Sequence, residues 1–157
     1  FKDPLIYEFA RFQIDFLENK FEYLLHDTVD SNWDRFLLII LAGYITNIYG
    51  SGRPESGAEH IVAKSIEKHY NWQHGSSVTF GVLCYMFLSG KFNQNIANMA
   101  IRIGHWHANK DLIDILDIGL VCSSVLPRAG RITILDNKSE SEIQKAFHET
   151  MEYIRVI

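Results

Sequence analysis

The sequence predicts an all-α fold, a single domain of six or seven packed helices. Apolar residues recur at steps of three and four along most of the chain, which is the spacing of one helix face. Helix-start signals precede several of these stretches, among them the Asp3-Pro4 pair and the Ser139-x-x-Glu142 capping box. The chain has 157 residues and 47% of them are hydrophobic, which suffices for one core. We therefore expect one helical domain over 1–157.

The first two helices are expected over 4–26 and 32–49. The first carries a stripe rich in phenylalanine, which we interpret as core or domain interface. Ser31 is the predicted N-cap of the second helix. Because the second helix is apolar on most sides near 37–41, we expect it to lie centrally in the domain.

Three further helices are expected over 57–69, 76–89 and 92–103. Ser56-x-x-Glu59 is a second capping box, and it starts the first of the three. In the helix over 76–89, Gly81 and the small Ser77 would let another backbone or a substrate approach closely.

The remaining helices are expected over 110–118, with Asn109 as N-cap, and over 140–155. Residues 119–126 are expected to add at most a short turn before a loop over 127–137. Cys84 and Cys122 lie in apolar runs, so we expect two buried, reduced thiols and no disulfide.

Composition narrows the class of protein. The formal net charge is −4 and the basic residues are scattered, which argues against a nucleic-acid surface. No apolar run is long enough to cross a bilayer, and no signal peptide is visible, so we expect a cytoplasmic protein without a membrane partner. The first residue is Phe1 and not methionine, so we expect the natural start to lie upstream.

Two histidines are candidate metal ligands. His60 falls in the first turn of a predicted helix, and His74 falls at the break between two helices. Neutral imidazole is a common ligand for Zn, Fe and Ni. The alternative is that both are surface residues, since the chain has seven histidines. We expect His69 to be an exposed helix-end residue, and His105 and His107 to be surface residues.

Arg53 is the one cation in the loop before the helix over 57–69. It can pair with Glu55 or cover a helix C-terminus. It can also bind an anionic substrate together with the helix start at Ser56, since guanidinium and free backbone N–H groups both donate to phosphate.

Residues 50–82 carry a family resemblance. The run Ser-Gly-Arg-Pro-Glu-Ser-Gly-Ala-Glu-His over 51–60, followed by His-Gly-x-x-Val-x-x-Gly over 74–81, resembles the C-terminal domain of the sn-glycerol-1-phosphate dehydrogenase and glycerol dehydrogenase group. This group belongs with the iron-containing alcohol dehydrogenases and 3-dehydroquinate synthases. The resemblance implies that His60 and His74 are two metal ligands.

The chain departs from this family in two ways. The family's third ligand is an aspartate far upstream, and only 59 residues precede His60. Asp3 is the one candidate at this end, but as an N-cap before a proline it already has a structural role. The family's nucleotide-binding domain, with its glycine-rich turn, is also absent. We expect a piece, or a stand-alone descendant, of a two-domain enzyme.

The predicted function is that of the metal-binding half of an NAD(P)-dependent polyol or polyol-phosphate dehydrogenase. The resemblance implies a divalent metal (Zn, Fe or Ni), an NAD(P) cofactor held mainly by the missing domain, and a homo-oligomer as a further option. The chain alone is expected to be inactive. Two alternatives remain open: a dehydroquinate-synthase-like cyclase, and a non-catalytic helical interaction module.

Overall fold

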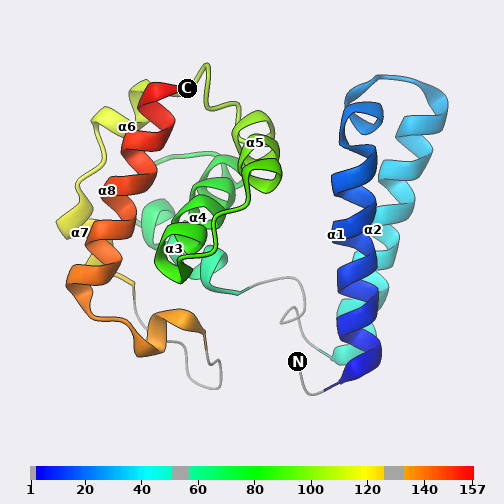
Figure 1. Cartoon of the computed structure of the whole chain (residues 1–157), viewed down its shortest axis with the longest axis horizontal. Coiled ribbons are helices and arrows are strands. Elements are labelled where there is room, and N and C mark those ends of the chain that lie inside the picture. Colours follow the sequence, from blue (N-terminus) through cyan, green and yellow to red (C-terminus); the bar gives the residue numbers. More distant parts are fainter. Residues whose placement is uncertain (1–2, 51–56, 126–132) are drawn as a thin grey trace. The chain divides into compact units, whose positions relative to one another are not determined.

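The computed structural model describes residues 3–50, 57–125 and 133–157, and these ranges are helical with no strand among them (Figure 1). The all-α prediction is confirmed. The chain divides into two compact units, residues 1–56 and 57–157. No helix in the described ranges is long and apolar enough to cross a membrane.

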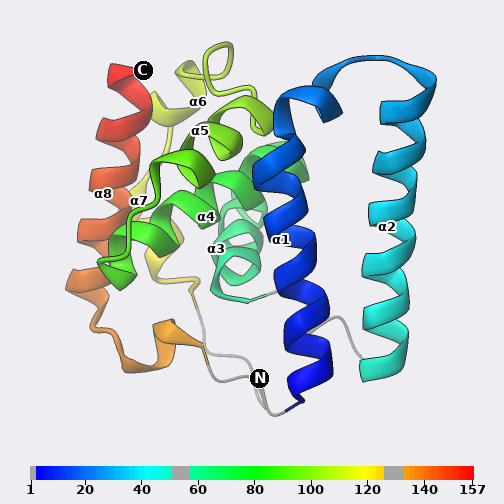
Figure 2. The same ribbon diagram turned by 45° about the vertical axis from the view of Figure 1, so that its right-hand side comes forward.

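The first unit is a hairpin of α1 (Pro4–Leu25) and α2 (Val29–Tyr49), which lie side by side and antiparallel (Figure 2). Asp3 caps α1 as predicted, because its Oδ1 accepts the backbone N–H groups of Leu5 at 3.0 Å and Ile6 at 3.3 Å. Asp3 thus has the structural role that the Asp-Pro pair indicates.

The second helix starts earlier than predicted. Thr28 is its N-cap and accepts the backbone N–H of Ser31 at 3.1 Å, while the Ser31 hydroxyl accepts the backbone N–H of Thr28 at 3.1 Å. Ser31 is therefore the third residue of a capping box and not the cap. The prediction missed the first turn because Thr28 and Ser31 are both good N-cap residues and Ser31 was chosen.

The prediction that α2 lies centrally is wrong. Only Ser31 and Ile45 of this helix are buried. A helix in a two-helix hairpin has one helical neighbour, so an apolar sequence on several sides leaves much of that surface uncovered. The large side chains of α2 that remain exposed are Val29, Trp33, Phe36, Leu37, Ile39, Ile40, Tyr44, Ile48 and Tyr49.

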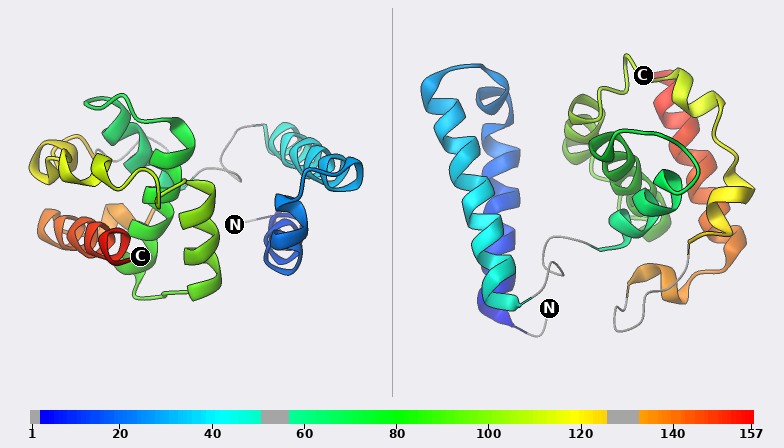
Figure 3. Two further views of the ribbon diagram at one scale, coloured as in Figure 1. Left: turned by 90° about the horizontal axis from the view of Figure 1, so that it is seen from above. Right: turned by 180° about the vertical axis from the view of Figure 1, so that it is seen from behind.

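The second unit contains the larger core. It is built from α3 (Ala58–Glu67), α4 (His74–Ser89), α5 (Gln94–Ile103), α6 (Asp111–Asp114), α7 (Ile118–Cys122), the 3₁₀ helix η1 (Ile134–Asn137) and α8 (Glu140–Val156). The central helix is α4, which packs against α3, α5 and α8 (Figure 3).

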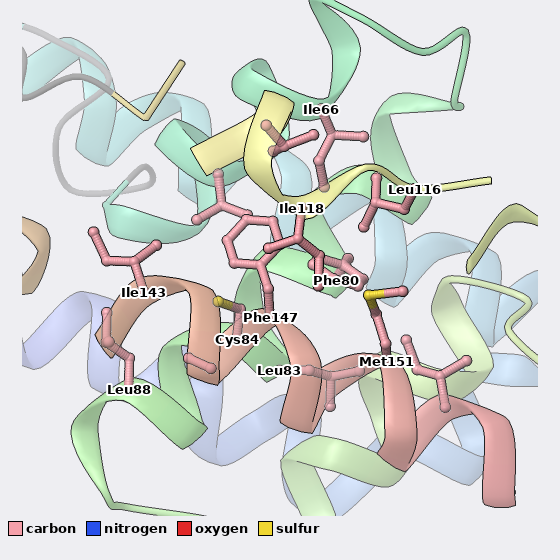
Figure 4. Packing of buried hydrophobic residues seen from close by; sticks show 14 of the residues in the cluster. Ile66, Phe80, Leu83, Cys84, Leu88, Leu116, Ile118, Ile143, Phe147 and Met151 are labelled. Atoms are coloured by element: carbon pink, nitrogen blue, oxygen red, sulfur yellow. The ribbon is translucent and has the colours of Figure 1, made fainter. Parts of the chain in front are cut away.

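Side chains from α4 and α8 fill the middle of this unit. Phe80, Leu83 and Cys84 of α4 face Phe147 and Met151 of α8, and all five are buried (Figure 4). Cys84 and the buried Cys122 are free thiols, as predicted. Burial raises the pKa of the Cys122 thiol to about 12, so the thiol is protonated at neutral pH.

Gly81 sets how closely α3 and α4 approach. A Cβ atom at this position would lie 2.9 Å from both the Cα and the carbonyl carbon of Glu59, and closer still to its carbonyl oxygen. The start of α3 therefore lies directly on the backbone of α4. This confirms the prediction that the glycine allows close approach of another backbone.

The predicted helix over 110–118 is wrong in extent. The chain forms two short helices there, because Asp117 caps a new one by accepting the backbone N–H of Leu120 at 3.0 Å. Asn109 is not a helix cap; its side-chain amide donates to the carbonyl of Gly104 at 3.1 Å. The Ser139–Glu142 capping box of α8 is confirmed.

Candidate functional site

The rings of His60 and His74 lie next to each other. Their centroids are 5.5 Å apart and their planes are inclined by 59°. His60 is in the first turn of α3, as predicted, and His74 is the first residue of α4. The close approach at Gly81 packs the start of α3 against α4, and in this arrangement the two imidazoles meet.

Each ring contacts a carboxylate through the same nitrogen. Nδ1 of His60 lies 2.9 Å from Oε1 of Glu59, and Nδ1 of His74 lies 2.7 Å from Oε1 of Glu67. A carboxylate accepts hydrogen bonds, so these contacts favour the tautomer with the proton on Nδ1. That tautomer leaves a lone pair on each Nε2, for which the described residues offer no hydrogen-bond partner.

Glu59 is held by its surroundings. Its Oε1 also accepts the backbone N–H of Gly57 at 2.6 Å. Burial raises the pKa of Glu59, but the hydrogen bonds from the His60 ring and from Gly57 outweigh this and leave its pKa below the ordinary value. Glu59 is therefore an ionised acceptor at neutral pH.

This arrangement fits a metal site in its donor chemistry. A histidine that ligates a metal usually donates its other ring N–H to a carboxylate or carbonyl, which fixes the ring and its tautomer. Both histidines here have that second contact. In the described part of the chain, no group of three or more His, Cys, Asp or Glu side chains is gathered as a ligand set. The described residues thus bring two candidate ligands together, without a third beside them.

The other candidate residues have different outcomes. Arg53 and Ser56, predicted to contact substrate, lie outside the described residues, as does Glu55. His105 and His107 are exposed, as predicted. The prediction for His69 is wrong, because its Nε2 lies 2.6 Å from Oγ of Ser124 and the side chain is half-buried.

Sequence reasoning missed the two carboxylates. Glu59 was assigned to a capping box with Ser56 as N-cap, but this prediction is wrong, because the N-cap of α3 is Gly57 and no side chain in the described ranges caps the helix. The Glu59 side chain instead accepts the backbone N–H of Gly57. Nothing in the sequence indicated that the same oxygen faces His60. Glu67 gave no signal at all, since it meets His74 only after the chain turns between α3 and α4.

Part of the chain is similar to a glycerol-1-phosphate dehydrogenase. Over 65 residues it is 35% identical to the glycerol-1-phosphate dehydrogenase (NAD(P)+) of Thermofilum pendens. The matched stretch covers 40% of this chain and 18% of that protein, so the chain spans less than a fifth of this relative. No protein-family model matches the chain, and no solved structure matches it. The glycerol-1-phosphate dehydrogenase similarity agrees with the resemblance on residues 50–82.

Proposed function

We propose that this chain is the metal-binding helical part of a polyol-phosphate dehydrogenase-like enzyme. The observation that carries the proposal is the pairing of the His60 and His74 rings, each with a carboxylate on Nδ1. The partial similarity to a glycerol-1-phosphate dehydrogenase supports the class of reaction. A dehydrogenase of this class oxidises a secondary alcohol with NAD(P) as hydride acceptor.

In this proposal, His60 and His74 hold a divalent ion through their Nε2 atoms. Zn, Fe and Ni all accept imidazole ligands, and the proposal does not depend on which one is bound. When bound, such an ion supplies Lewis-acid polarisation of a substrate oxygen. His60 on α3 and His74 on α4 would position that ion. The NAD(P) site would belong mainly to a nucleotide-binding partner domain, and the remaining ligand would be the aspartate that the family carries upstream of this motif.

Arg53 and Ser56 are the proposed contacts for the substrate's phosphate. They immediately precede α3, the helix that carries His60. A guanidinium beside a helix N-terminus binds phosphate through paired donors and a favourable dipole. A polyol phosphate could then place its hydroxyl at the metal beside His60 and its phosphate at Arg53 and Ser56, so that it contacts both ends of the 51–60 motif.

The α1–α2 hairpin supports the proposal of a protein partner. Its exposed large apolar side chains, among them Phe12, Ile39 and Tyr44, are of the kind that protein partners cover. The nucleotide-binding domain or a second copy of the chain would cover such a surface.

The metal proposal is tested by titrating the purified chain with Zn²⁺ in a calorimeter. We expect one ion per chain, and at least a tenfold loss of affinity in both His60→Ala and His74→Ala. His107→Ala is the matched control, because His107 is an exposed histidine of the same unit. Equal zinc affinity in the wild type and in both site variants would rule out the site.

A second candidate function is a helical interaction module without catalysis. A surface pocket of about 350 Å³ on the hairpin favours it; its lining is formed by Leu5, Glu8, Phe9, Phe12 and Leu41. Binding of Zn²⁺ that depends on both site histidines would favour the enzyme, and its absence would favour the module.

A further inference from the structure

We infer that Glu59 and Glu67 are positioning residues for the two histidines. Each carboxylate holds the Nδ1–H tautomer of one ring and fixes its orientation, so that both Nε2 atoms are kept available as ligand atoms. The inference rests on the proposed function for the metal, whereas the fixed tautomer is a property of the metal-free protein.

The first observation is selectivity. All seven histidines lie in the described ranges, yet within those ranges only His60 and His74 contact a carboxylate. These two are also the pair whose rings meet. Both carboxylate contacts use Nδ1 and neither uses Nε2. Chance ion pairs would not be expected to fall on the two histidines whose rings meet, or to use Nδ1 in both.

The second observation is that Glu59 is rigidly placed. Its side chain is 23% exposed, and one oxygen receives both the His60 ring and the backbone N–H of Gly57. Its backbone lies against Gly81 of α4, where there is no room for a Cβ atom. A carboxylate fixed at both its backbone and its oxygen imposes its direction on the ring that it contacts.

The third observation concerns Glu67, the last residue of α3. Its side chain is 28% exposed, whereas that of His74 is 60% exposed. The more ordered partner is therefore the carboxylate, and the 2.7 Å contact restrains a ring that solvent would otherwise leave free to rotate. This bridge also joins the end of α3 to the start of α4 across residues 68–73.

The alternative is that both contacts are ordinary surface ion pairs, which stabilise locally but do not select a tautomer. The two cases differ in a measurable property. A histidine side chain free in water favours the proton on Nε2, whereas a carboxylate at Nδ1 favours the proton there. The tautomer of each ring therefore reports directly on the role of its glutamate.

The experiment compares the wild type with Glu59→Gln, Glu59→Ala, Glu67→Gln and Glu67→Ala, and uses Glu152→Ala as the charge-matched control on an exposed position of α8. Two-bond ¹H–¹⁵N correlation spectra of the metal-free proteins at pH 8.5 give the tautomer of each ring. We expect Nδ1–H at both rings of the wild type and of the control. Each alanine variant should move its own ring to Nε2–H, with partial rescue by glutamine, whose amide oxygen still accepts.

Zinc titration of the same proteins gives the second readout. We expect each alanine variant to bind Zn²⁺ about 10–100-fold more weakly than the wild type, the usual effect of removing such a partner. Far-UV circular dichroism checks folding. Glu59→Gln serves if Glu59→Ala unfolds, because glutamine still offers an oxygen to the Gly57 N–H.

The outcomes separate the two ideas. Tautomers that stay unchanged in the alanine variants would overturn the positioning role, and so would unchanged zinc affinity in a wild type that binds zinc. If the tautomers move as expected but the wild type binds no zinc, the positioning role stands and the proposed metal function fails.

Discussion

Gly81→Ala should destabilise the second unit, although alanine is the better helix former. The added Cβ would lie 2.9 Å from two backbone atoms of Glu59, about 0.5 Å short of the 3.4 Å at which ordinary van der Waals contact begins. Backbone atoms cannot rotate away as a side chain can, so α3 and α4 have to separate. Overpacking of this kind costs about 1–3 kcal/mol, and we place this site at the upper end.

The gain from helix propensity opposes this cost. Replacing glycine by alanine inside a helix contributes about 1 kcal/mol of stability. The expected net loss is therefore about 2 kcal/mol. For a unit of this size, such a loss lowers Tm by roughly 8–16 °C. Because the helix pair that separates also carries His60 and His74, zinc affinity should fall with it.

Urea unfolding followed by tryptophan fluorescence measures the effect, since Trp72 and Trp106 are buried in this unit. Gly75→Ala is the control in the same helix, because a Cβ there meets nothing within 4 Å. The control should stay within about 0.5 kcal/mol of the wild type. If Gly81→Ala were as stable as the wild type, the predicted steric conflict between α3 and α4 at this position would be refuted.

Three further predictions concern other parts of the chain. Ser139→Ala should cost about 1 kcal/mol in chemical denaturation by removing the cap of α8, whereas the exposed Ser141→Ala should not. Hydrogen bonds from the backbone and side chain of Ser139 and from the Lys138 ammonium lower the pKa of Glu142 from 4.5 to about 2. The stabilisation that the ionised Glu142 gives the fold is therefore complete above pH 4.5 and is lost as the pH falls toward 2. Glu142→Gln should flatten this part of the acid-unfolding profile. Gly43→Ala in α2 meets no atom within 4 Å and should raise the thermal stability of the hairpin by up to about 1 kcal/mol.

Local sequence determined the helical class and several of its boundaries. Asp3-Pro4 and Ser139-x-x-Glu142 mark helix starts because the groups that satisfy the first N–H donors lie within three residues of one another. The spacing of apolar residues likewise located the core helices of the second unit. Where these local signals competed, as at Thr28 and Ser31 or at Asn109, the prediction placed the cap wrongly.

The sequence also singled out His60 and His74, through a motif and not through any physical pattern. Their adjacency depends on tertiary packing. It requires α3 and α4 to fold back on each other at Gly81, a contact between residues 22 positions apart. The roles of Glu59 and Glu67 follow from the same packing, since hydrogen bonds to a ring nitrogen depend on direction as well as on proximity.

The exposure of α2 likewise depends on the tertiary structure and not on its sequence alone. Its sequence is apolar enough for the centre of a domain, yet most of its large side chains are exposed in the hairpin. The sequence sets how much apolar surface a helix has, and burying that surface is favourable. The number of elements packed against the helix decides how much of the surface is buried. The sequence thus determined the helices, most of their caps and the candidate ligands. Only the tertiary structure decided which of those residues meet, because contacts between distant segments depend on how whole helices pack.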